Sequence, residues 1–190
     1  NMIDLNKYYK YNTNQKESLD LMGQTYFLLT PVKGLTIRAQ QAIDAYDYKG
    51  ASINYPSYEP YSYRGRNSQA FDRYYQLSST NTAEYKTDIN QKHFFAVLAG
   101  HESFIRHTAS FSATGTGLTD DRIVNFGSTT DISSWAGGDS ECAFNSFFGN
   151  ANYNYADRYF VDASIRTDGS SLFGKNHRYA TFYSFGGMWK

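Results

Sequence analysis

Residues 159–166 read YFVDASIR, and this stretch decides the fold. Its odd positions are Tyr, Val, Ala and Ile, whereas its even positions are Phe, Asp, Ser and Arg. Successive side chains of a β-strand point to opposite faces of a sheet, so the stretch predicts a strand with one apolar and one polar face. Residues 150–155 and 35–40 alternate in the same way. The chain is therefore expected to be all-β.

Seven strands are expected, and the lengths of their connections carry a second signal. The strands cover residues 18–30, 35–49, 70–88, 93–112, 142–155, 158–168 and 178–190. Short connections at 31–34, 88–92 and 156–157 alternate with longer ones at 50–69, 113–141 and 169–177. Outer-membrane barrels show this alternation because one rim has tight periplasmic turns and the other has exposed loops. The pattern predicts an antiparallel transmembrane β-barrel segment.

The barrel interpretation assigns the two faces of residues 159–166. The polar side chains are expected to face the lumen: Asp162, Ser164 and Arg166. The apolar ones are expected to face lipid: Tyr159, Val161, Ala163 and Ile165. Bacterial single-chain barrels have even strand numbers. Seven strands therefore predict part of a larger barrel, unless one strand is missed within 1–15 or 122–132.

Composition agrees with a barrel and argues against several other classes of protein. Aromatic residues make up 18% of the 190 residues, yet the mean hydropathy is −0.61. Aromatic girdles around a polar lumen produce this pairing, although a carbohydrate-binding β-protein also permits it. The 18 basic residues balance 18 acidic ones, which removes the electrostatic case for nucleic-acid binding. The chain begins at Asn1 with no signal peptide, so it is expected to be a fragment.

The sequence contains no convincing constellation for catalysis or for a metal ion. His101 and His107 are six residues apart, whereas a zincin helix needs a spacing of four. Asp120 and Asp121 offer loop oxygens for calcium, but without the spacing of a calcium loop. We therefore expect no enzyme activity, no cofactor and no metal. The single cysteine, Cys142, has no partner for an internal disulfide.

The long connections contain the candidates for ligand contact. Tyrosine and tryptophan stack on sugar rings and are favoured at interfaces, and arginine donates directional hydrogen bonds to hydroxyls and carboxylates. The candidates are Tyr58, Tyr61, Tyr63, Arg64, Arg66 and Trp135. Packing of these loops on their neighbours or on a partner protein is the competing interpretation.

Residues 144–190 resemble the SusC/RagA family of TonB-linked outer-membrane transporters. The resemblance rests on FFGNANYNY at 147–155, DRY at 157–159 and RTDGSSLFG at 166–174. It continues with Tyr179, Phe182, Ser184, Gly187 and Trp189. Upstream, PVKGL at 31–35 resembles the family's periplasmic turn, and VLAGHE at 97–102 resembles one of its strands.

The resemblance implies a 22-stranded barrel in the bacterial outer membrane, surrounded by lipid. It also implies an N-terminal plug, energy from a TonB complex, a SusD-like lipoprotein lid and import of a bulky nutrient such as an oligosaccharide or a peptide. Residues 1–190 would be one barrel segment that lacks the plug and any TonB box. Two alternatives stay open: a soluble carbohydrate-binding β-sandwich, and a complete eight-stranded barrel with a structural or adhesive role.

Overall fold

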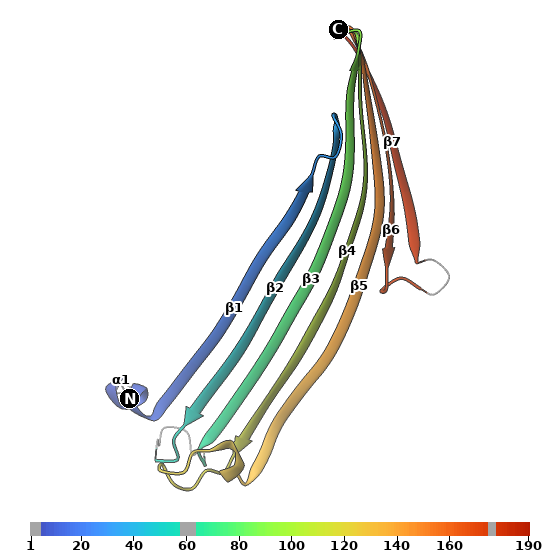
Figure 1. The fold of residues 1–190 in the computed structure, drawn as a ribbon. Helices are drawn as coiled ribbons and strands as arrows, with labels where there is room; N and C mark the ends of the chain where they lie inside the picture. Colours follow the sequence, from blue (N-terminus) through green and yellow to red (C-terminus); the bar gives the residue numbers. More distant parts are fainter. Residues whose placement is uncertain (1–4, 58–63, 175–177) are drawn as a thin grey trace. The chain divides into compact units, whose positions relative to one another are not determined.

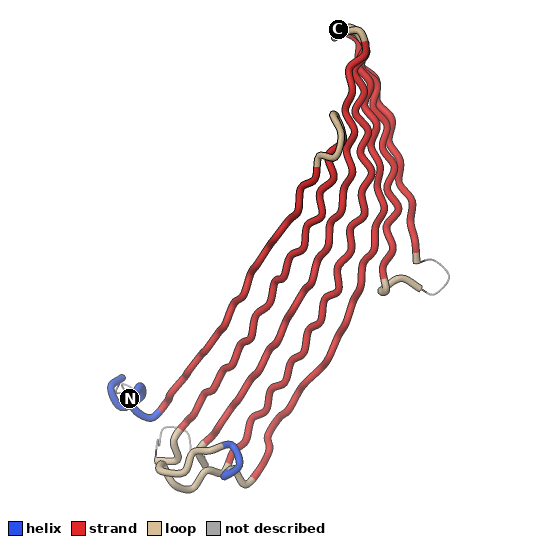
Figure 2. The backbone as a smooth tube through the Cα atoms, viewed as in Figure 1, coloured by secondary structure: helices blue, strands red, loops and turns tan. Residues whose placement is uncertain are grey.

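The computed structural model describes residues 5–57, 64–174 and 178–190, and nearly all of them lie in strands (Figures 1 and 2). One seven-stranded sheet contains the strands in chain order, β1 to β7. The elements are α1 Leu5–Tyr11, β1 Asn12–Leu29, β2 Leu35–Asn54, β3 Arg66–Ile89, β4 His93–Thr116, the 3-10 helix η1 Phe126–Ser128, β5 Asp131–Tyr155, β6 Tyr159–Ser170 and β7 Tyr179–Trp189.

All seven expected strands are present, and most are longer than predicted. β1 begins at Asn12, directly after α1, and the other large extensions lie at ends that border the long connections: β2 continues to Asn54, and β5 begins at Asp131. The long connections are correspondingly shorter than expected. Neither candidate for a missed strand is confirmed, because residues 5–11 form α1 and residues 126–128 form η1. The single sheet also differs from the two packed sheets of a β-sandwich.

Two of the short connections are tight hairpins with left-handed backbone. Ala156 and Asp157 both have φ of 52°, and Arg158 N donates to Tyr155 O at 3.0 Å. Asn90 and Gln91 both have φ of 55° in the β3–β4 turn. Two successive residues with positive φ are typical of type I′ turns, whose twist matches that of the strands they join. These turns explain why the chain reverses here within so few residues.

The described chain divides into two compact units. The first contains Asn1–Leu21, Ala45–Tyr75 and His107–Ser140, and it carries the long connections between β2 and β3 and between β4 and β5. The second contains Met22–Asp44, Gln76–Arg106 and Glu141–Lys190, and it carries the short turns together with β6 and β7.

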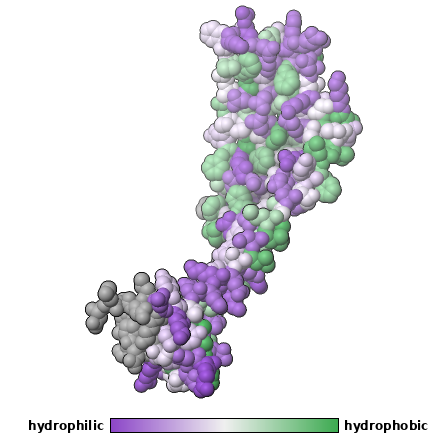
Figure 3. Space-filling view, turned by 90° about the vertical axis from the view of Figure 1, so that its left-hand side faces the viewer, coloured by the Kyte–Doolittle hydropathy of each residue, from purple (hydrophilic) through white to green (hydrophobic). Residues whose placement is uncertain are grey.

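The sheet has almost no buried core. Among the described residues, the buried apolar side chains are Ala96, Ala113 and Leu118. No second layer covers the sheet, and apolar side chains lie open on the surface in Figure 3. A water-soluble sheet normally buries its apolar face against another layer. The exposed apolar side chains are therefore expected to be covered by something outside the described residues.

The register of the last three strands defines the two faces of the second unit. β6 pairs antiparallel with β5 and with β7, so that Val161 is opposite Tyr153 and Gly187. Residues directly opposite each other point to the same face. We call the face that carries Asp162, Ser164 and Arg166 the polar face. The face that carries Tyr159, Val161, Ala163 and Ile165 is the apolar face.

Candidate functional site: the two faces of the sheet

A charged cluster joins three strands on the polar face. Arg166 of β6 donates from Nη2 to Glu102 Oε2 of β4 at 3.0 Å, and from Nε to Asp168 Oδ1 at 2.6 Å. Ser146 of β5 is fully buried, and its Oγ donates to the same Asp168 Oδ1 at 2.6 Å. A guanidinium held by two carboxylates has a fixed orientation. The cluster is therefore a rigid feature of this face.

An aromatic ring packs against the charged cluster. Phe148 is opposite Arg166 in the register, and the guanidinium carbon of Arg166 lies 5.5 Å from the centre of the ring. The ring covers Gly100 of β4: a Cβ added at Gly100 would meet three atoms of the Phe148 ring. Glycine within a strand often marks such a close approach. Gly100 is therefore what lets the ring lie flat on β4.

The three predicted lumen-facing residues lie together on the polar face. Ser164 Oγ lies 2.8 Å from Ser184 Oγ of β7, within hydrogen-bonding distance. Asp162 is opposite Gly186, and a Cβ at Gly186 would lie 2.6 Å from Asp162 Oδ1. Arg166 belongs to the charged cluster. All three neighbourhoods are polar and capable of contact with water or a polar ligand.

The apolar face carries large exposed side chains. Ile165 is 55% exposed, and its register partner Tyr183 of β7 is 86% exposed. Tyr159 lies at the hairpin end between Tyr155 and Trp189. Aromatic side chains at strand ends beside an aliphatic middle are the pattern of an interfacial girdle.

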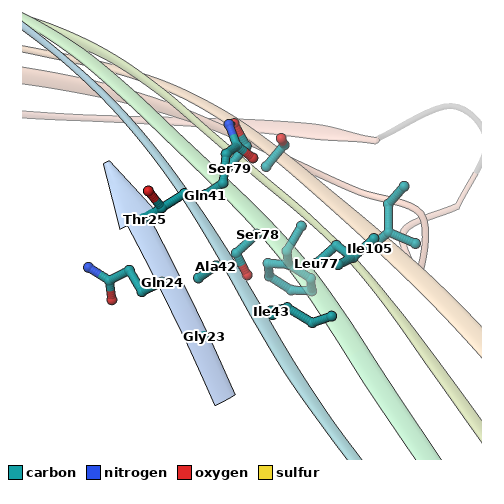
Figure 4. A pocket seen from close by; sticks show the side chains of 12 residues that line it. Gly23, Gln24, Thr25, Gln41, Ala42, Ile43, Leu77, Ser78, Ser79 and Ile105 are labelled. Atoms are coloured by element: carbon teal, nitrogen blue, oxygen red, sulfur yellow. The ribbon is translucent and has the colours of Figure 1, made fainter. Parts of the chain in front are cut away.

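A trough of about 520 Å³ crosses β1 to β4 in the second unit (Figure 4). One wall consists of Thr25, Gln41, Ser79 and Ser103, and the other of Ile43, Leu77 and Ile105. Gln41 Nε2 donates to Ser79 Oγ at 2.8 Å, and Asn81 Nδ2 donates to the same oxygen at 3.1 Å. Gly23 lines the trough without a side chain.

Strand alternation places the trough on the apolar face. Glu102 contacts Arg166 on the polar face, so its neighbours Ser103 and, two residues on, Ile105 point the opposite way. Arg106 likewise donates to Gln76 at 2.8 Å, which turns Leu77 away from the polar face. The trough is therefore separate from the charged cluster.

In the first unit, polar contacts hold the connections 55–65 and 117–130 together. Asp121 accepts from Ser57 N at 3.0 Å and also from the Ser57 hydroxyl. Gly117 N donates to Arg64 O at 2.6 Å. Arg122 donates to Asp120 at 2.6 Å, and its side chain and backbone N–H together lower the pKa of Asp120 to about 2. The two aspartates considered for calcium thus have protein partners.

The structure separates the predicted ligand-contact residues. Arg66 begins β3, and its Nε donates to Ser68 Oγ at 3.2 Å. Trp135 is not in a loop, as predicted, but on β5, where it is 74% exposed. Residues 131–141 lack apolar alternation, so pairing with β4 and not side-chain pattern makes them a strand. Arg64 is described and exposed, whereas Tyr58, Tyr61 and Tyr63 lie outside the described residues.

Sequence reasoning missed three members of the charged cluster: Glu102, Ser146 and Asp168. Asp168 lies in the quoted RTDGSSLFG segment, and its i, i+2 spacing from Arg166 puts the two on one face. That spacing was the available signal. Glu102 is 64 residues from Arg166, and no local pattern links them.

Neither a metal cluster nor a membrane-spanning helix is found in the described part of the chain. No three His, Cys, Asp or Glu side chains there are grouped to hold an ion. His101 pairs with Asn145 at 2.6 Å, while the adjacent Glu102 binds Arg166. No helix among the same residues is long and apolar enough to cross a membrane.

Comparisons with known proteins agree on one class. No family model matches the chain. It is 26% identical to TonB-dependent receptor P26 of Formosa agariphila over 94% of its length, and 48% identical to receptor P3 of that organism over 44 residues. It superimposes on the RagAB peptide transporter with a TM-score of 0.89, at 32% identity over 96% of the chain. The RagAB peptide importer in its open-open state gives 0.88 at 33% identity.

These similarities confirm the predicted resemblance to TonB-linked transporters, the antiparallel barrel-segment fold and the outer-membrane localisation. The chain spans 19% of receptor P26 and 21% of the RagAB chain that it matches. The relatives are receptors and transporters and not enzymes, in keeping with the prediction of no enzyme activity.

Proposed function

We propose that residues 1–190 form one stretch of the barrel wall of a TonB-dependent outer-membrane importer for a bulky nutrient. The importer acts by binding and gated passage, and no covalent bond of the nutrient is broken. The plug that closes the barrel is expected elsewhere in the same protein. A TonB complex supplies energy, and a SusD-like lipoprotein forms the lid.

The observation that carries this proposal is the sheet with two open and chemically different faces. Asp162, Ser164 and Arg166 occupy one face, where Ser164 and Arg166 have polar partners, while Ile165 and Tyr183 are exposed on the other. If the apolar face lies in lipid and the polar face borders a water-filled lumen, both faces are in a suitable solvent. An inward-facing polar wall offers hydrogen bonds to a hydrophilic cargo.

The face assignment is tested by cysteine labelling in the full-length protein, in a background where Cys142 and any other cysteine are replaced. Ser164→Cys is expected to react with a membrane-impermeant maleimide, because water fills the lumen. Ile165→Cys, one residue away on the opposite face, is expected to react only with a lipid-soluble reagent. The same reagent preference at both positions contradicts the barrel-wall assignment.

Transport is tested by deleting the full-length gene and measuring growth on single nutrient sources. Loss of growth on either peptides or oligosaccharides, restored by the intact gene and abolished by an uncoupler, supports TonB-driven import. The peptide arm is favoured, because the RagAB structures that match this chain are of a peptide transporter. Unchanged growth on both classes, or growth insensitive to the uncoupler, contradicts the proposal.

The polar loop pair of the first unit is proposed to border the entrance. Asp121 ties the two connections together through Ser57, and Arg64 lies in the same pair. Arg64, Arg66 and the tyrosines Tyr58, Tyr61 and Tyr63 are proposed for contact with cargo or with the lid. Trp135 is proposed for the same contacts from its position on β5.

A further inference from the structure

We propose that the trough across β1 to β4 is a binding site for an acyl chain of an outer-leaflet lipid. The inference rests on the proposed orientation of the apolar face toward lipid, but it concerns neither cargo nor transport. The trough lies on the apolar face, between outward side chains of four neighbouring strands. Its volume of about 520 Å³ lies within the range of specific small-molecule sites.

The absence of a side chain at one position creates the hollow. Gly23 of β1 lies beside Ile43 of β2, and a Cβ at Gly23 would already approach Ile43 Cγ2 to 3.3 Å. Two other residues of β1 on the same face are large: Leu21 is 54% exposed and Phe27 is 74% exposed. Any longer side chain at position 23 would project into the trough and fill it.

The chemistry of the walls selects an apolar occupant. Charged side chains are absent from the lining, and Ile43, Leu77 and Ile105 present methyl groups along one wall. Gln41, the amide of the other wall, already has a partner, because it donates to Ser79 Oγ, which also accepts from Asn81 outside the lining. The lining therefore has no charged side chain to attract a polar protein segment, and its Gln41 amide already has a partner. A flexible hydrocarbon chain gains the most from such a surface.

Strand geometry places the β4 end of the trough toward the loop side of the bilayer. Ser103 lies ten positions after His93, the first residue of β4. Ten residues rise about 33 Å along a strand, which becomes about 25 Å for a strand tilted by about 40°. That is the height of the apolar band of an outer-membrane barrel. Because the short turns mark the periplasmic rim, the β4 end of the trough lies at the outer edge of the band.

The test measures lipid retention by the purified full-length protein in native mass spectrometry. Delipidated protein is titrated with lipopolysaccharide and, separately, with phosphatidylethanolamine. Gly23→Phe fills the trough, and Val97→Phe is its matched control on the same face outside the lining. We expect one tightly retained lipopolysaccharide in the wild type and in Val97→Phe. Retention in Gly23→Phe is expected to fall roughly tenfold, the effect of about two methylene groups left unburied.

A second pair of variants covers the case in which Gly23→Phe does not fold. Leu77→Ala widens the trough, and Val161→Ala makes the same kind of truncation elsewhere on the apolar face. Leu77→Ala is expected to lose the lipid several-fold faster than Val161→Ala. The proposal is overturned if both members of each folded pair retain lipopolysaccharide equally, or if the protein prefers phosphatidylethanolamine. It is also overturned if the variants change the oligomeric state and lose no lipid.

Failure of the acyl-chain proposal can be told apart from failure of the proposed function. If Ile165→Cys labels from water, both the lipid-facing orientation and the acyl site are wrong. If Ile165→Cys labels from lipid and the trough variants retain lipid normally, only the acyl site is wrong. Nutrient uptake is expected to be unchanged in Gly23→Phe, because the trough lies on the face opposite to the charged cluster.

Discussion

Replacing Gly100 by alanine is expected to destabilise the barrel, although alanine is normally the better strand residue. The new Cβ would occupy space held by the Phe148 ring, so the ring must move away from β4. Overpacking of this kind costs about 1–3 kcal/mol. Moving the ring also weakens its contact with Arg166, which is worth about 0.5–1 kcal/mol at a partly exposed site. Alanine recovers about 0.5–1 kcal/mol relative to glycine in a strand. The last two contributions roughly cancel, so the net loss is about 1–3 kcal/mol.

Gly149 of β5 provides the matched control. A Cβ there would lie 3.6 Å from Leu98 O and 3.7 Å from Ile165 Cγ2, which are ordinary contacts. Gly149→Ala is therefore expected to be neutral or stabilising by about 0.5 kcal/mol. The assay is urea unfolding of the full-length protein in phospholipid vesicles, followed by loss of the folded band on unheated gels.

A double-mutant cycle separates the clash from any general intolerance of position 100. In a Phe148→Ala background the obstructing ring is gone, so Gly100→Ala is expected to cost less than about 0.5 kcal/mol. Equal stability of Gly100→Ala and Gly149→Ala would refute the reasoning. An unchanged cost of Gly100→Ala without the ring would refute it as well.

Three further predictions test other parts of the structure. Ile165→Lys is expected to reduce outer-membrane assembly more than Ser164→Lys, by about 2–4 kcal/mol for a midplane lysine in lipid, and equal folded yields would contradict the face assignment. Gly34→Ala is expected to destabilise the β1–β2 turn by about 1–2 kcal/mol, measured by urea unfolding, because φ is +87° and a Cβ would meet Lys86 O. The pKa of Asp120 is about 2, below its ordinary 3.8, so its contribution to the stability of the 117–130 connection is full above pH 3.8 and declines as the pH falls toward 2. Arg122→Gln is expected to remove this pH dependence from the rate of proteolysis in the connection, and an unaltered pH profile would contradict the pairing.

The charged cluster holds the Arg166 side chain in one orientation on the polar face, next to serine hydroxyls that are less constrained. Arg166 is bound by two carboxylates, whereas Ser164 and Ser184 have hydroxyls that rotate freely between partners. Partly exposed ion pairs contribute little to stability. Orientation is therefore the main consequence of the cluster, which keeps one guanidinium against Phe148 on the polar face.

The sequence by itself determined that the chain forms consecutive β-strands joined by alternating short and long connections, and which residues of β6 share a face. Local alternation suffices for these features, because the side-chain period of a strand is two and a tight turn leaves no freedom in the following register. It also determined the family resemblance, through long ordered matches such as residues 147–155 and 166–174.

Only the tertiary structure decided how far the strands extend and which distant residues meet. Apart from Ile132 and Trp135, residues 131–141 carry polar or small side chains without a period of two, so their strand state depends on pairing with β4 and not on hydrophobic pattern. Glu102 and Arg166 meet because β4 and β6 flank β5 in one sheet, although 64 positions separate them. The trough likewise requires four strands in register around Gly23. Such features depend on pairing between segments far apart in the chain, which no local pattern of side chains encodes.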